Sequence, residues 1–380
     1  MANASPLHGA AYIGVIGIFR IKFNCSFSYS TFFQDDERRK TMNFTVYKQL
    51  KTFGRLLLSK FTGKKFLLSA SFVITNRCNS RCGYCNTYNT PSEEMTTREI
   101  FQMIDEFSDL GIRRIGFTGG EPLLREDMGS IVSHAHHKGI TTTLFSNGAL
   151  VPKKIDGLKH LDLLLLSLDG PPEIHDTVRG LKGSFNHVQN AIHAAHEAQL
   201  PVWINAVITK GNVSHLPFLL DFAVDNQVKV MLMPVFDHTL SATKDTITHL
   251  GADEASFKGA INHLIVQKKK GAPIVNSLSY FQYILQNWPD TNRLNCRAGM
   301  NFCAVGSDGT VYPCHFFVGS PCGADGRRLG FRNAFESIRT PKCKGCFCNA
   351  YIELNLFIEG HLNVILNTVK HMEQRRHRDD

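Results

Sequence analysis

The 380-residue sequence has no hydrophobic run long enough to cross a membrane as a helix. Its longest strongly apolar run, residues 10–19, is about half of what a bilayer requires. The residues before it carry no positive charge, unlike a secretory signal. We therefore expect a cytoplasmic protein, in which clustered cysteines serve as metal ligands or catalytic groups rather than disulfides.

Cysteine is absent from residues 86–295, although the chain contains eleven cysteines. Three precede this gap, seven follow it, and Cys25 is isolated. Small disulfide-rich domains are not built with such a gap, so two separate metal sites explain the distribution better. The first group is Cys78, Cys82 and Cys85, and the second is Cys296, Cys303, Cys314, Cys322, Cys343, Cys346 and Cys348.

Acidic residues are absent from residues 38–65, which contain nine lysines and arginines. This segment accounts for the whole formal net charge of +9, so the balanced remainder is not a basic surface for DNA. Apolar residues between the cations predict an amphipathic leading helix over residues 42–68. We favour the interpretation that the apolar face of this helix covers the end of the core. Contact with an anionic membrane or with RNA is the alternative. Residues 1–41 lack periodicity, and we expect a disordered extension or a start of translation at Met42.

From residue 69 onward, short apolar runs alternate with amphipathic stretches, which predicts an α/β fold with a parallel sheet. Six units suit a partial (β/α)6 TIM-type barrel over residues 69–235, and a doubly wound sheet is the alternative. Strands are predicted at 69–75, 114–118, 141–146, 162–168, 201–208 and 228–233, with helices at 96–110, 126–138, 152–158, 184–199 and 214–226. Thr96 and Glu99 are spaced as a capping box, and Ser184 is the expected N-cap of its helix.

The rest of the chain predicts two further parts. Residues 236–295 are expected to form a helical linker, including a helix over residues 253–270. Residues 296–380 are expected to form a small separate cysteine-rich domain with a hairpin near Gly309. An amphipathic stretch over residues 351–369, interrupted at Gly360, is expected to pack over the second metal site.

The first cysteine group directly follows the first predicted strand with the spacing Cys-x3-Cys-x2-Cys. Three thiolates on one short loop can bind three irons of a [4Fe–4S] cluster and leave the fourth iron open to a substrate. Structural zinc would require a fourth ligand at this position.

This spacing, with Tyr84 before the last cysteine, resembles the motif of the radical S-adenosylmethionine (SAM) superfamily. Further motifs lie near the carboxyl ends of the next predicted strands, and in a parallel barrel these ends meet at one rim. The motifs are Gly119-Gly120-Glu121-Pro122, Ser146-Asn147-Gly148, Ser167-Leu168-Asp169-Gly170 and His175-Asp176-x2-Arg179-Gly180, with Asn205 in the fifth strand.

The resemblance implies a [4Fe–4S] cluster on the first three cysteines and SAM bound beside it. In that family the Gly-Gly-Glu turn binds the SAM amino group, and the serine and arginine contact its carboxylate or ribose. From the residues alone, Asp169 could merely shape a turn and Arg179 could be a surface cation, while His175 is expected to be structural. The expected cofactor contacts are Tyr84, Gly119, Gly120, Glu121, Asn147, Ser167, Asp169, Arg179 and Asn205.

The spacing Cys296-x12-Gly309-x4-Cys314 resembles the opening of the SPASM and twitch extensions, which bind auxiliary [4Fe–4S] clusters. Cys343 and Cys346 complete the four-ligand set that we predict. A closed set of four cysteines also suits zinc, which stays an alternative here.

Two cysteines compete for this second site, namely Cys303 and Cys348. No cysteine follows Cys348, so a twitch-like domain with one auxiliary cluster is expected. Cys322 and Cys25 are expected to be free thiols.

The resemblance implies a radical SAM oxidoreductase or maturase. Such an enzyme reductively cleaves SAM to a 5′-deoxyadenosyl radical, which abstracts hydrogen from a substrate. A peptide or protein is the first expectation for the substrate; cofactor, lipid and RNA modification are alternatives, and a non-enzymatic iron–sulfur or zinc scaffold is the rival class. A flavodoxin or ferredoxin is expected as the electron donor, and peripheral membrane contact is not favoured.

Overall fold

The computed structural model describes residues 52, 54–56, 58–91, 93–237, 246–291, 295–340, 342–343 and 345–368. The chain divides into two compact units, residues 1–53 and 54–380, and only Thr52 of the first unit is described. The fold below is therefore that of the second unit. The expected extension over residues 1–41 lies outside the described residues.

One sheet holds all the described strands, in the order β6-β5-β4-β3-β2-β1-β7-β8-β9. The first six strands are parallel to their neighbours and follow the chain order, which confirms the predicted barrel-type sheet. The doubly wound alternative is wrong, because that topology reverses the strand order at a switch point. The strands are β1 (Ser69–Thr75), β2 (Arg114–Gly119), β3 (Thr141–Ser146), β4 (Leu163–Ser167), β5 (Val202–Ile208) and β6 (Lys229–Pro234).

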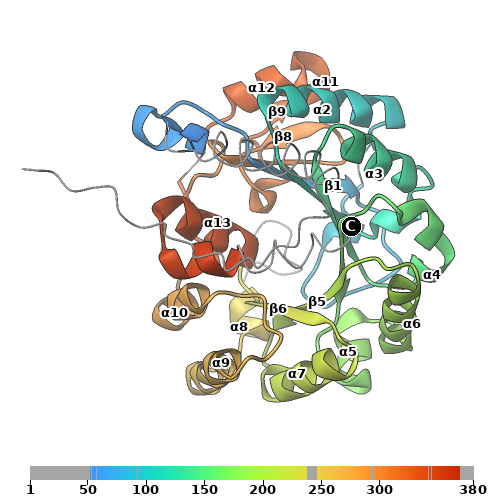
Figure 1. Cartoon of the computed structure of the whole chain (residues 1–380), viewed down its shortest axis with the longest axis vertical. Coiled ribbons are helices and arrows are strands. Elements are labelled where there is room, and N and C mark those ends of the chain that lie inside the picture. Colours follow the sequence, from blue (N-terminus) through green and yellow to red (C-terminus); the bar gives the residue numbers. More distant parts are fainter. Residues whose placement is uncertain are drawn as a thin grey trace, which may run out of the picture. The chain divides into compact units, whose positions relative to one another are not determined.

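Helices connect these strands and lie along the outside of the sheet (Figure 1). Leu144, Leu164 and Ile204 are fully buried in the core between the sheet and these helices. Their alternation with half-buried neighbours such as Phe145 and Asn205 gives the strands two distinct faces. The helices are α2 (Thr97–Leu110), α3 (Met128–His137), α4 (Val151–Lys154), α5 (Pro172–Arg179), α6 (Ser184–Glu197) and α7 (Leu216–Asp225), with 3-10 turns η1 (Thr87–Asn89), η2 (Pro122–Leu124), η3 (Ile155–Leu158) and η4 (Val213–His215).

Local sequence signals explain the helix ends, with two differences from expectation. Thr96 caps α2 through the side-chain and backbone exchange with Glu99 that the sequence predicted. The N-cap position of α6 is occupied by Gly183 and not by Ser184, which was expected there. The Ser184 hydroxyl instead donates a hydrogen bond to the Asp176 carboxylate. Helix α5 was not predicted, because its histidine, aspartate and arginine were interpreted as a loop motif.

The predicted linker forms three described helices, α8 (Thr246–Leu250), α9 (Glu254–Lys269) and α10 (Leu278–Asn287). The carboxyl-terminal part contains β7 (Phe302–Val305), β8 (Thr310–Tyr312), η5 (His315–Phe317), β9 (Ala324–Asp325), α11 (Gly326–Leu329), α12 (Phe331–Ser337) and α13 (Asn349–Glu359). The hairpin expected near Gly309 is formed by β7 and β8. Gly360 ends α13 with a positive φ of 92°, where the sequence predicted an interruption.

The carboxyl-terminal part is not set apart from the barrel as expected. Strand β7 pairs in parallel with β1, placing Cys303 opposite Ala70, and β8 and β9 extend the same sheet. This pairing covers the edge that β1 would otherwise present to solvent. The second cysteine group is thereby built directly onto the barrel.

The described part of the basic leading segment is helical at residues 54–56 and 58–62. Leu56 packs against Phe66 and against Ile358 of α13, as the core-covering alternative requires. Leu58 and Phe61 instead are 55% and 81% exposed. None of the described helices is both long and apolar enough to cross a membrane.

Candidate functional site

The loop with Cys78, Cys82 and Cys85 is held on one side by the turn after β2. The Gly120 N–H donates to the Thr75 carbonyl at 2.8 Å, and the Glu121 N–H donates to the Arg77 carbonyl at 2.8 Å. Gly119 has a φ of 138°, and a Cβ on Gly120 would lie 2.0 Å from the Arg77 oxygen. Both positions therefore require glycine, because a side chain at either would collide with the backbone where the cysteine loop begins. The glycines thus do more than form a tight turn.

The carboxyl end of α5 holds the other side of the cysteine loop. The Arg81 N–H donates to the Arg179 carbonyl at 3.1 Å, and the Gly83 N–H donates to the Val178 carbonyl at 3.2 Å. A Cβ on Gly180 would lie 2.5 Å from the Arg81 oxygen. Two sequence motifs that are distant in the chain thus clamp one loop between them.

Glu121 links the turn after β2 to the end of β3. Its carboxylate is fully buried and accepts hydrogen bonds from the Ser146 hydroxyl at 3.0 Å and the Asn147 N–H at 2.8 Å, and also from the Leu123 N–H. Burial raises the pKa of Glu121 to about 7, although these hydrogen bonds favour the charged form. The described contacts give Glu121 a role in joining two strand ends.

Asn147 connects the end of β3 to the cysteine loop. Its amide nitrogen donates to Asn79 Oδ1 at 2.6 Å and to Ser80 Oγ at 3.1 Å. The sequence reasoning passed over Asn79 and Ser80. Polar residues between the cysteines of one loop were the signal that could have indicated them.

Ser167 and Asn205 lie side by side on β4 and β5, where they are register partners. Both are half-buried, whereas their neighbours Leu166 and Ile204 point into the helix-facing core. Alternation along a strand therefore turns Ser167 and Asn205 to the opposite face, at the rim that carries the cysteine loop.

Asp169 and Arg179 form a buried ion pair beside Cys82. Asp169 is 0% and Arg179 7% exposed, and Arg179 Nη2 lies 2.7 Å from Asp169 Oδ2. Arg179 Nη1 also donates to Cys82 Sγ at 3.8 Å, and the guanidinium lies 5.6 Å from the Tyr84 ring centroid. The interpretation of Arg179 as a surface cation is therefore wrong.

His175 has the structural role that was expected for it. Its Nδ1 accepts a hydrogen bond from the Asp169 N–H at 3.1 Å. Burial and the nearby charge of Arg179 lower the pKa of His175 to about 3, so the ring is neutral and the acceptor role is maintained.

The first cysteine group has the donor chemistry of an iron–sulfur site. No disulfide joins the described cysteines, and the Ser80 N–H lies 3.4 Å from Cys78 Sγ. Burial raises the pKa of Cys78 to about 11 and also raises that of Cys82, so iron binding would displace protons. Among the described residues, no three His, Cys, Asp or Glu side chains converge on one metal ion. A cluster does not need such convergence, because each thiolate binds its own iron.

Five cysteines of the second group share one neighbourhood. Burial raises the pKa of Cys314, and the nearby Cys296, Cys343 and Cys348 raise it further. Burial likewise raises the pKa of Cys346, with contributions from Cys348, Cys314 and Cys296. The four predicted ligands and the competitor Cys348 therefore lie together.

The remaining cysteines of the second group lie apart from this neighbourhood. Cys303 is fully buried in the core between the sheet and its helices. Cys322 lies 3.1 Å from the Ser320 hydroxyl and packs near Val318. Burial raises the pKa of Cys303 and the charge of Lys65 lowers it, with no contribution from another cysteine, so Cys303 is a weaker competitor than Cys348. Cys25 lies outside the described residues.

Helix α13 packs over the second cysteine group. It begins directly after Cys348, and the Asn355 amide donates to Cys296 Sγ at 3.7 Å. The Tyr351 hydroxyl accepts a hydrogen bond from the backbone N–H of His315, the residue after Cys314. These contacts agree with the packing expected for this stretch.

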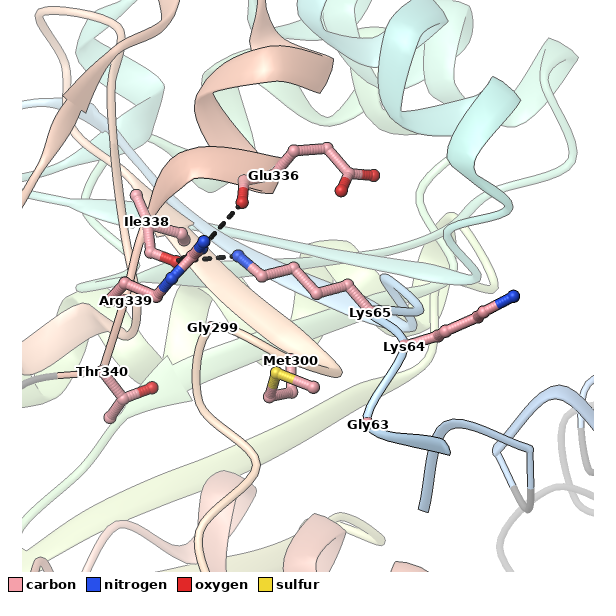
Figure 2. A pocket seen from close by; sticks show the side chains of 9 residues that line it. All are labelled: Gly63, Lys64, Lys65, Gly299, Met300, Glu336, Ile338, Arg339 and Thr340. Atoms are coloured by element: carbon pink, nitrogen blue, oxygen red, sulfur yellow. Dashed lines mark hydrogen bonds between the residues drawn. The ribbon is translucent and has the colours of Figure 1, made fainter. Parts of the chain in front are cut away.

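A basic pocket of about 550 Å³ adjoins the second cysteine group (Figure 2). Lys65 and Arg339 point toward each other, whereas Lys64 points away from them. Burial and the charge of Arg339 lower the pKa of Lys65 to about 8, while its ammonium donates to the Ile338 carbonyl at 2.8 Å. The pocket wall at Gly299 is hydrogen-bonded to Pro313, next to Cys314. The lining residues are Gly63, Lys64, Lys65, Gly299, Met300, Glu336, Ile338, Arg339 and Thr340.

The described residues thus form an open parallel barrel with a clamped three-cysteine loop at its carboxyl rim. The model of the Radical SAM superfamily matches residues 72–223, and enzymes of that superfamily bind a [4Fe–4S] cluster and SAM. The cysteine loop and the expected SAM contacts from Tyr84 to Asn205 lie in the matched segment, whereas the second cysteine group lies outside it.

Named relatives agree with this match. The chain is 25% identical over 336 residues to the AdoMet-dependent heme synthase of Methanosarcina barkeri, covering 76% of this chain and 93% of that protein. It is 29% identical over 171 residues to the PqqA peptide cyclase of Xanthomonas axonopodis, covering 43% of this chain and only 45% of that protein.

A solved structure shares the fold. Streptococcus suis SuiB, bound to its precursor peptide SuiA, superposes with a TM-score of 0.57 at 18% identity, covering 90% of this chain and 82% of that one. At this identity the likeness concerns the fold alone.

The contact between the Gly119–Gly120 turn and the cysteine loop predicts a stability difference between two glycines. Gly120→Ala places a methyl group against the Arg77 carbonyl, so we expect a loss of about 1–3 kcal/mol in the free energy of unfolding. Gly83→Ala is the matched control in the same loop, because its Cβ would meet no atom within 4 Å. Denaturant unfolding of both variants measures the difference, and equal stabilities would contradict the described contact.

Proposed function

We propose that this protein is a radical SAM enzyme whose cluster is held by Cys78, Cys82 and Cys85. The observation that carries the proposal is the clamp on their loop, formed by the turn after β2 and the end of α5. Both flanking segments carry motifs that were assigned to SAM from the resemblance. The cysteines, the turn and the strand ends thus form one continuous rim, as radical SAM chemistry requires.

The chain's own residues would bind and orient the two cofactors at this rim. A cluster held there by Cys78, Cys82 and Cys85 would supply one electron to SAM, which would then yield methionine and the 5′-deoxyadenosyl radical that takes a hydrogen atom from the substrate. The half-buried backbone at Gly119–Gly120 and the side chains of Ser167 and Asn205 would offer polar groups to SAM. Tyr84 and Asn147 complete the proposed surroundings from the cysteine loop and β3.

For the substrate we propose a peptide or protein. The similarity to a PqqA peptide cyclase over 171 residues supports this class. A heme precursor is the second candidate. It is favoured by the alignment to a heme synthase over 93% of that protein's length.

An auxiliary [4Fe–4S] cluster is proposed at the second cysteine group. Its ligands would be Cys296, Cys314, Cys343 and Cys346, with Cys348 as the competitor. The shared neighbourhood of these five cysteines and the packing of α13 over them support the assignment. A cluster at this position could accept an electron from a substrate radical, which would make the net reaction an oxidation.

We further propose a cytoplasmic location and an acidic one-electron carrier, such as a flavodoxin or ferredoxin, as the partner. The absence of disulfides among the described cysteines agrees with a reducing compartment. Lys64, at the border of the pocket in Figure 2, is exposed and points away from Lys65 and Arg339, so it offers its charge to an acidic surface.

Radical SAM chemistry predicts formation of 5′-deoxyadenosine. After anaerobic reconstitution with iron and sulfide, the protein with dithionite and SAM should release 5′-deoxyadenosine, quantified by chromatography. Cys82→Ala should reduce the yield to background, whereas Cys303→Ala is the control with a cysteine outside both proposed sites. Absence of product from iron-loaded wild type, or equal yields from Cys82→Ala and wild type, would sink the proposal. Stimulation by an iron porphyrin, and by no peptide, would favour the second substrate class.

Iron counting tests the second site separately. With Cys78, Cys82 and Cys85 all replaced by alanine, we expect about four irons per chain to remain. Adding Cys314→Ala should release them, because Cys314 lies near Cys296, Cys343 and Cys348. Adding Cys303→Ala should not, because the charged group near Cys303 is Lys65 rather than another cysteine. Zinc in place of iron, or loss of iron on removing Cys303, would contradict the ligand set.

Charge reversal tests the partner surface. Lys64→Glu should slow electron transfer from reduced flavodoxin several-fold at low ionic strength, and the difference should vanish at about 0.5 M salt. Lys159→Glu is the control, since Lys159 is exposed and lines a different groove. Stopped-flow absorbance measures the rates. Equal slowing by both variants would show that only the net charge matters.

A further inference from the structure

We propose that Arg179 is a positioning residue for the cluster, and that its charge raises the reduction potential of the cluster bound by Cys82 and its two neighbours. This inference rests on the proposed function. It differs from the role implied by the resemblance, in which this arginine contacts SAM.

The guanidinium of Arg179 is committed to protein groups on several sides. Nη2 pairs with Asp169 Oδ2 at 2.7 Å, and Nη1 donates to Cys82 Sγ at 3.8 Å. The Tyr84 ring, two residues after Cys82, lies 5.6 Å away. Only 7% of Arg179 is exposed, so solvent screens its charge little. The charge therefore acts mainly on the neighbouring groups, which include Cys82 of the cysteine loop.

Asp169 is itself fixed and cannot follow Arg179 toward solvent. Its Oδ1 accepts a hydrogen bond from the Val207 N–H at 3.0 Å, and its carbonyl accepts one from the Asn212 amide at 2.8 Å. Its own N–H donates to the neutral ring of His175 at 3.1 Å. Hydrogen bonds to three segments therefore fix the position of Asp169, whose carboxylate pairs with Arg179.

The backbone of Arg179 acts on the same loop as its side chain. Its carbonyl accepts the Arg81 N–H at 3.1 Å, so the residue sets the loop position and points a positive charge at the loop. The Asp176 carboxylate accepts hydrogen bonds from the Gly183 N–H and the Phe185 N–H, which anchors the chain just beyond α5. The cation is thus held in place before any cofactor binds.

The electrostatic consequence has a definite sign. Reduction adds one electron to the cluster, and a nearby cation in a poorly solvated site stabilises the more negative state. The charge of Asp169 opposes this effect but acts on Cys82 less strongly than the charge of Arg179. Removing Arg179 should therefore lower the potential, and neutralising Asp169 should raise it.

The test is a redox titration of the reconstituted holoenzyme without SAM, followed by electron paramagnetic resonance. For Arg179→Met we expect at least a tenfold fall in the ratio of reduced to oxidised cluster at a set potential, which is a shift of 59 mV for one electron. Arg179→Lys should restore most of the ratio, because it keeps the charge. Asp169→Asn should shift the ratio in the opposite direction.

Lys182→Met is the matched control, since Lys182 lies three residues after Arg179 but is exposed to solvent, where its charge is screened. Unchanged potentials in Arg179→Met and Asp169→Asn, or shifts no larger than that of Lys182→Met, would overturn the proposal. Weaker SAM binding by Arg179→Met at an unchanged SAM-free potential would instead assign the residue to SAM.

Two outcomes remain distinguishable from these. If Arg179→Met fails to bind iron, the reduction potentials of the other two variants test the proposal. Asp169→Asn should raise the potential, and Arg179→Lys should keep it close to the wild-type value. If wild type itself holds no cluster on its first three cysteines, the proposed function fails, and this inference fails with it. A wild type that cleaves SAM with unaltered potentials in all variants refutes the inference alone.

Discussion

The position of one loop constrains most of the described site. The loop after β1 carries three cysteines, and backbone hydrogen bonds hold it to the turn after β2 on one side and to the end of α5 on the other. Close backbone approach is what makes this arrangement work, because a side chain at Gly120 or Gly180 would collide with the loop carbonyls. The glycines of two separate motifs therefore serve the same loop.

Buried charge is the second theme of the site. Glu121 and the pair formed by Asp169 and Arg179 are removed from water, and each is balanced by several hydrogen bonds or by an opposite charge. Such groups are costly to bury, so each must be held by well-directed partners. Here the partners come from different strand ends, and the charged groups thus tie the rim of the barrel together around the cysteines.

The sheet also relates the two cysteine groups. Strand β7 adds to the barrel beside β1, so both groups are attached to one structural unit. Helix α13 covers the second group, and the basic pocket adjoins it near Gly299.

The sequence by itself determined the features that depend on local order. Strand alternation predicted the six barrel strands, the Thr96–Glu99 spacing predicted a helix start, and the spacing of Cys78, Cys82 and Cys85 predicted an iron–sulfur loop. These signals are readable because they arise between residues a few positions apart. The placement of motifs at strand ends followed from the parallel topology alone.

Only the tertiary structure decided which distant groups meet. Arg179 and Cys82 are ninety-seven positions apart, and no local pattern indicates that the arginine is buried against that sulfur. Which cysteines of the second group come together likewise depends on packing, since Cys314 lies near Cys296, Cys343 and Cys348, whereas Cys303 lies on β7 beside β1. Which side chains are buried and which charges pair depends on how remote segments pack together. A single stretch of sequence therefore does not reveal these contacts.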